Sequence, residues 1–212
     1  MTTATIKGVQ RQTSDAEVNV GVEINRGLLV AQSLPPFAEH QRRGDGWTVG
    51  TATLFAPIVA FPTTTAQLEV YNNGRRTMII SSLYASQIVG PTVQEAAGIF
   101  AMVSTQKAVP TLTALNVYSM SGKAIVVPTA SSELVTGVGT TVVANGWRPW
   151  GPPISFGLGA APPGSHWSAE IDGRIIVPPL CSLCMHIVAS VATASAFQCG
   201  FSFAWDTMTV DA

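Results

Sequence analysis

Hydrophobic and polar residues alternate along much of this chain, most clearly near its C-terminal end. Between residues 196 and 205 every second side chain is apolar, namely Phe197, Cys199, Phe201, Phe203 and Trp205. Successive side chains of a β-strand point to opposite faces, so these five would share one face. The pattern predicts a half-buried strand whose aromatic face packs in a core.

Similar segments, rich in β-branched and aromatic residues, predict strands through most of the sequence. Turn-forming stretches such as Asn-Asn-Gly-Arg-Arg at 72–76 separate them, at a spacing typical of a β-sandwich or barrel. The expected strands span residues 48–55, 66–71, 77–88, 98–104, 114–119, 123–127, 140–144 and 183–189. Helix is scarce. The sequence therefore predicts an all-β chain, a jelly-roll-like antiparallel sandwich with an extended N-terminal arm.

A hairpin is predicted around Asp172 and Gly173. Residues 167–171 and 174–177 flank this dipeptide, which is favoured in two-residue type I′ turns because both positions need a positive φ. Two prolines at 178 and 179 then interrupt the pairing. We expect residues 167–177 to form two strands paired with each other.

Glycine and proline are concentrated in residues 145–164, which predicts a long loop or crossover. This segment contains Trp147, Arg148 and Trp150. Tryptophan rings beside a guanidinium are typical of binding hot spots, so these three residues are candidate contacts for a partner or a glycan. A structural alternative stays open, because tryptophans in a crossover also plug the end of a sandwich or lie in a subunit interface.

Charge divides the chain into an arm and a body. Of its 212 residues 11 are basic and 12 acidic, and ten of these charges fall in the first 45 residues. We therefore predict an assembly or attachment arm at 1–45 and a sandwich body at 46–212. So few charges on a body of this size indicate a subunit that buries its flanks in neighbours.

The same composition argues against several classes of protein. Residues 46–68 and 175–205 carry no charge, yet prolines interrupt both and their polarity alternates with period two, unlike a spanning helix. A net charge of -1 argues against nucleic acid as a direct partner. Residues 1–12 lack the apolar core of a secretory signal, so we expect synthesis in the cytoplasm and no membrane partner.

The spacing of three cysteines and a histidine is compatible with a zinc site, but the expected strand geometry argues against one. Cys181 and Cys184 form C-x-x-C, with His186 close behind and Cys199 on the next predicted strand. On a continuous strand Cys181 and Cys184 would point to opposite faces, and Cys199 belongs to the aromatic stripe. We expect core packing, with no metal and no other cofactor.

No catalytic constellation is apparent. The three histidines, His40, His166 and His186, do not accompany a nucleophile motif such as G-x-S-x-G. A Gly-x-Gly sequence at 157–159 has proline at 162 where a dinucleotide-binding loop needs its third glycine. We predict that the protein is not an enzyme.

The closing segments AEIDGRIIVPP, LCMHIVAS and AFQCGFSFAW, with the charge-poor body and the arm, resemble the single jelly-roll proteins of virus and bacteriophage particles. The resemblance is architectural, covers residues 46–212 and assigns no functional residue. Tumour-necrosis-factor-like trimers and some lectins share its outline. It implies a capsid decoration or minor capsid protein of the virion, commonly a homotrimer, whose arm grips the major capsid protein, another virion protein or an adjacent subunit.

Two functions follow as expectations. The first is the virion structural role. The protein would then be made in the host cytoplasm and would act in the virus particle. The alternative is a glycan-binding receptor-recognition module of a phage tail or fibre, which would read sugars through Trp147, Arg148 and Trp150.

Overall fold

A computed structural model describes most of the chain as β-strands. The described residues are 6–9, 17–20, 37, 40–41, 44–105, 109, 111, 113, 115–127, 129, 131–144, 146–156, 165–192 and 194–206. The chain divides into two units, Met1–Pro35 and Pro36–Ala212. In the first unit, β1 (Ile6–Val9) pairs antiparallel with β2 (Glu17–Val20).

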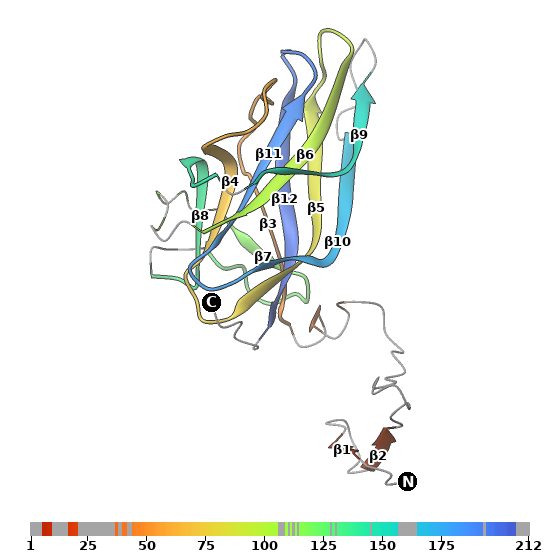
Figure 1. Ribbon diagram of the computed structural model, residues 1–212, viewed down its shortest axis with the longest axis vertical. Helices are drawn as coiled ribbons and strands as arrows, with labels where there is room; N and C mark the ends of the chain where they lie inside the picture. Colours follow the sequence, from red (N-terminus) through yellow and green to blue (C-terminus); the bar gives the residue numbers. More distant parts are fainter. Residues whose placement is uncertain are drawn as a thin grey trace. The chain divides into compact units, whose positions relative to one another are not determined.

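The second unit contains two five-stranded antiparallel sheets that form a sandwich (Figure 1). One sheet has the order β10-β5-β12-β3-β7 and the other β8-β4-β11-β6-β9. The strands are β3 (Gly46–Gly50), β4 (Thr65–Asn72), β5 (Thr77–Val89), β6 (Glu95–Ser104), β7 (Val117–Ser119), β8 (Leu134–Thr141), β9 (Arg148–Phe156), β10 (Ser165–Val177), β11 (Ser182–Ala189) and β12 (Ala196–Asp206).

Strands from the two ends of this unit pair in a nested order. β3 pairs with β12, β4 with β11, β5 with β10 and β6 with β9, and successive early strands alternate between the two sheets. This connectivity, two rolled-up Greek keys, is that of a jelly roll. The insertion between β6 and β9 supplies β7 and β8, which extend one sheet each. The predicted all-β, jelly-roll-like antiparallel sandwich is confirmed.

The aromatic stripe of β12 lies in the core, as its alternation predicts. Phe197, Phe201 and Phe203 are at most 1% exposed, and the Trp167 ring meets Phe197 edge-on at 5.8 Å. Each buried phenylalanine contributes about 2 kcal/mol of hydrophobic stabilisation. The opposite face of β12 is also covered, because Tyr84 of β5 lies across Gly200. The strand is therefore buried on both faces rather than half-buried.

The predicted hairpin at Asp172 and Gly173 is wrong. Both residues have positive φ (49° and 78°), as the dipeptide requires, but the flanking segments belong to one strand, β10. Glu170 is opposite Ser82 and Ile175 is opposite Ile80, so four residues of β10 bulge out against one of β5. The two halves pair with β5 instead of with each other, and residues 171–174 form a large irregular bulge.

Other element boundaries also differ from the sequence-based expectations. The glycine- and proline-rich segment contains a strand, β9, at residues 148–156, while residues 157–164 lie outside the described part of the chain. Its prolines are tolerated because β9 is an edge strand. Of the strand expected at 140–144 only Thr140 and Thr141 belong to a strand, as the end of β8, and residues 123–127 contribute a single bridge through Val126.

We expect Gly200→Ala to lower the free energy of unfolding by about 3 kcal/mol, because the surrounding chain cannot easily make room for the added methyl group. A β-carbon there would lie 2.3 Å from the Val49 carbonyl oxygen and 2.3 Å from the Tyr84 hydroxyl. Urea denaturation measures the loss. The matched control is Gly98→Ala, whose new β-carbon would meet only Phe100, at 3.8 Å. Equal losses in the two variants would contradict this account of the packing.

Candidate functional site

The outer face of the β10-β5-β12-β3-β7 sheet is built largely from small, uncharged side chains. Strands β3, β5 and β7 contain no charged residue, whereas β10 carries the exposed Glu170, Asp172 and Arg174 and β12 ends at Asp206. The Tyr84 hydroxyl donates a hydrogen bond to the Val49 carbonyl oxygen (3.0 Å) and lies 3.3 Å from the Thr48 hydroxyl. Burial raises the pKa of Tyr84, so the phenol stays neutral. Such a face loses little polar solvation when a neighbouring protein covers it.

The β3–β4 and β5–β6 connections, which turn at the same end of the sandwich (Figure 1), carry exposed apolar side chains together with the last residues of β5. Val59 is 53% exposed and Phe61 60%, although the Phe61 ring meets the Phe100 ring edge-on at 5.6 Å. We call this surface the apolar end. It comprises Leu54, Val59, Phe61, Ile88, Val89 and Val93.

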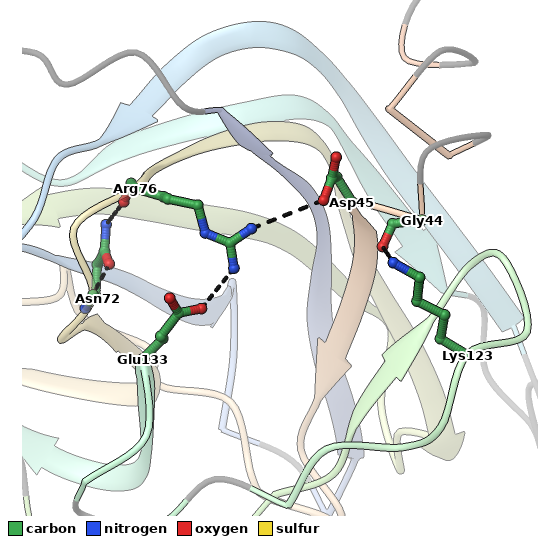
Figure 2. Close-up of polar contacts among 7 residues, drawn as sticks. Gly44, Asp45, Asn72, Arg76, Lys123 and Glu133 are labelled. Atoms are coloured by element: carbon green, nitrogen blue, oxygen red, sulfur yellow. Dashed lines mark hydrogen bonds and ion pairs between the residues drawn. The ribbon is translucent and has the colours of Figure 1, made fainter.

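The start of the body is held by polar contacts, drawn in Figure 2. The Lys123 ammonium donates to the Gly44 carbonyl oxygen (2.9 Å). The Arg76 guanidinium lies between Glu133 (2.6 Å) and Asp45 (3.8 Å). Gly44 and Asp45, the last residues of the predicted arm, are thus bonded to the body.

A cleft of about 280 Å³ opens where the edge strands β9 and β10 lie on the same side of the sandwich (Figure 1). Two arginines line it and no acidic residue does. The remaining lining is mostly apolar. The full set is Ala101, Met102, Val103, Gly146, Arg148, Trp150, Arg174, Ile175 and Ile176.

Arg174 is held in this cleft by its own backbone and by an aromatic ring. Its Nε donates to the Ile171 carbonyl oxygen (3.0 Å) and one terminal nitrogen donates to the Glu170 carbonyl oxygen. Its guanidinium carbon lies 5.7 Å from the centre of the Trp150 ring, within the range of a cation–π contact. Ile171 of the bulge and Glu170 just before it supply the two carbonyl groups, so this irregularity positions the arginine.

The structure separates the two tryptophans that the sequence places three residues apart. Trp147 is 5% exposed, and its indole nitrogen donates to the Thr63 carbonyl oxygen (2.8 Å). It packs in a small cluster with Cys184 on the outer side of the β8-β4-β11-β6-β9 sheet. Of the predicted contacts only Arg148 and Trp150 line the cleft.

Cys184 and Cys199 pack in separate hydrophobic clusters and do not form a common site. Cys199 lies in the main core and Cys184 in the small cluster, and burial raises the pKa of both thiols. His186, whose pKa is lowered by burial, meets Phe55 and Trp147 edge-on. Within the described residues, no group of three or more His, Cys, Asp or Glu side chains is arranged to hold a metal ion.

A carboxyl group is buried on β4. Glu69 is fully buried, and the Ser182 hydroxyl donates to its Oε1 at 2.6 Å. Burial raises the pKa of Glu69, while the bond from Ser182 acts in the opposite direction. Cys184 and Tyr71 are the neighbouring titratable groups, and neither is a cation that could favour the charged carboxylate.

The chain matches no known protein family, no curated protein and no solved structure. In the part of the chain that is described, no helix has the length and apolar character needed to cross a membrane.

Sequence reasoning missed the contacts that two arginines make. Arg76, expected on a solvated turn, stacks 4.7 Å above the Trp205 ring and bridges two carboxylates. Arg174 was assigned to a simple hairpin strand. No local signal marks either residue, because both depend on contacts with distant strands.

We expect Glu69→Gln to stabilise the protein increasingly as the pH rises. The native carboxyl has a raised pKa, so above about pH 4.5, the unfolded value, the wild type loses stability until its native pKa is passed. Glutamine can still accept the bond from Ser182. Urea denaturation between pH 4 and pH 8 measures the difference, and Glu170→Gln, at an exposed position, is the control. A pH-independent difference would contradict the assignment.

Proposed function

We propose that this protein is a virion structural protein, a capsid decoration or minor capsid protein. It assembles as a homotrimer and attaches through its N-terminal arm to the major capsid protein or another virion protein. The observation that carries this proposal is a jelly-roll body whose outer sheet face carries no charge on β3, β5 and β7 and whose apolar end is exposed.

The apolar end is the surface that most favours burial. Between residues 46 and 68 the chain has no charged side chain, and that stretch supplies Leu54, Val59 and Phe61. The cores of subunit interfaces are enriched in aromatic side chains and depleted of charged ones. Each partner in a standard interface buries about 800 Å². Closure around a threefold axis at this end would cover all three side chains.

The arm suits attachment because it differs in chemistry from the body. Ten of the 23 charged residues lie in the first 45 positions, and its strands β1 and β2 pair with each other. An extended or hairpin segment can bind another protein through main-chain hydrogen bonds at a sheet edge, with side chains adding specificity.

We expect light scattering coupled to size exclusion to give the full chain a native mass near three times 22.2 kDa. Phe61→Glu should reduce the mass to that of one chain, because a charge cannot be buried there without a partner. Val127→Glu, at a side chain that is 54% exposed and lies near β7, should remain trimeric. A monomeric wild type, or dissociation by Val127→Glu alone, would refute assembly through the apolar end.

Deleting residues 1–35 should leave a folded, trimeric body that no longer binds the parent particle. This cut spares Gly44 and Asp45, whose contacts with Lys123 and Arg76 hold the start of the body. Circular dichroism checks folding, and co-sedimentation with particles lacking the protein checks attachment. Undiminished co-sedimentation of the truncated chain would show that the body, and not the arm, makes the contact.

A further inference from the structure

The cleft between β9 and β10 is lined by two positively charged side chains. Arg148 and Arg174 both line it, and within the described residues neither forms an ion pair with a carboxylate. Arg76 shows the contrast, since it bridges Glu133 and Asp45. In a chain with a net charge of -1, two such guanidiniums in one cleft indicate an anionic ligand.

Arg174 is positioned before any ligand arrives. Its Nε and one terminal nitrogen are held by the carbonyl groups of Ile171 and Glu170, and its plane is supported by Trp150. Its Nη1 makes no hydrogen bond with any described residue. Asp172 and Gly173 adopt positive φ to form the bulge, a local cost that the placement of Arg174 would explain.

The rest of the lining is apolar and the volume is small. Val103 and Ile175, which pack in or against the main core, line the cleft together with Trp150, while the Met102 side chain belongs to the outer cluster with Cys184. Its volume of about 280 Å³ is just below the ~300–1,000 Å³ typical of small-molecule pockets. A compact ring with C–H faces and one charged group fits these walls better than a flexible acidic chain does.

The neighbouring edge disfavours an extended peptide. A peptide that adds to a sheet edge needs a row of free N–H and C=O groups. Strand β9 contains Pro149, Pro152 and Pro153, which have no N–H to donate. The edge beside the cleft therefore cannot pair regularly with another strand.

We propose that this cleft binds a sugar ring that carries a carboxylate, such as a hexuronic acid residue of a glycan. The carboxylate lies between Arg148 and Arg174, and the C–H face of the ring packs on the apolar wall beside Trp150. This activity goes beyond the structural role and does not depend on it. It retains Arg148 and Trp150 as glycan contacts, adds Arg174 and excludes Trp147.

Calorimetric titration of the full chain with digalacturonic acid, and with the neutral galactose disaccharide of the same linkage, tests the proposal. The acidic sugar should bind at least about tenfold more tightly, since each charge-assisted hydrogen bond contributes about one such factor or more. Arg174→Gln and Arg148→Gln should each weaken binding about tenfold. Arg174→Lys, which keeps the charge without the planar fork, should lose less than Arg174→Gln.

Control measurements test whether binding occurs in the cleft and is independent of assembly. Arg75→Gln removes an exposed arginine outside the cleft and should leave the affinity unchanged. In nitrogen–proton correlation spectra the indole signal of Trp150 should shift with added acid sugar, and that of Trp147 should not. The native mass of the Arg174→Gln variant should equal that of the wild type, which separates this test from the test of assembly.

Three results would overturn the proposal. The first is equal affinity for the acidic and neutral sugars, and the second is an equal loss of binding in Arg75→Gln. The third is binding of a diglutamate peptide as tight as that of digalacturonic acid, which would make the cleft a general carboxylate site. Like the second result, a Trp150 signal that shifts equally in the wild type and in Arg174→Gln would show that binding does not depend on the arginines of the cleft.

Discussion

The body depends on the pairing of its last strand with its first and third. β12 lies in the middle of one sheet, hydrogen-bonded to β5 on one side and to β3 on the other, and its aromatic side chains fill the space between the sheets. About 150 residues separate Val49 from its partner Phe201. The core therefore cannot close until the C-terminal strand is in place, and contacts so distant in sequence favour slow folding.

Local chemistry predicted the strands well where burial alone decides their pattern. The stripe from Phe197 to Trp205 and the fold class both followed from alternation and turn residues. The hairpin at Asp172 and Gly173 did not, although the positive φ angles expected of both residues occur. A turn dipeptide specifies backbone angles, while the choice between a hairpin and a bulge depends on β5, about 90 residues away along the chain.

The candidate cleft was likewise predictable from the sequence only in part. Trp147 and Trp150 are three residues apart, and in an extended segment that spacing sends side chains to opposite faces. One ring packs on the outer side of its sheet and the other lines the cleft. The sequence could have predicted that the two side chains point to opposite faces, but residues 145–164 were predicted to form a loop, so the spacing was not interpreted in this way. Arg174 was not predictable, since its role depends on which strands bring Trp150 and the bulge together.

Both edges of the β8-β4-β11-β6-β9 sheet are interrupted as surfaces for strand pairing. The edge strand β9 has no N–H at its three prolines, and at the other edge the Thr136 carbonyl oxygen of β8 already accepts a hydrogen bond from the Thr113 N–H (2.8 Å). Regular edge-to-edge pairing with a second copy through this sheet is therefore disfavoured on both sides. Interrupted edges of this kind are one way in which β-proteins avoid strand-to-strand aggregation.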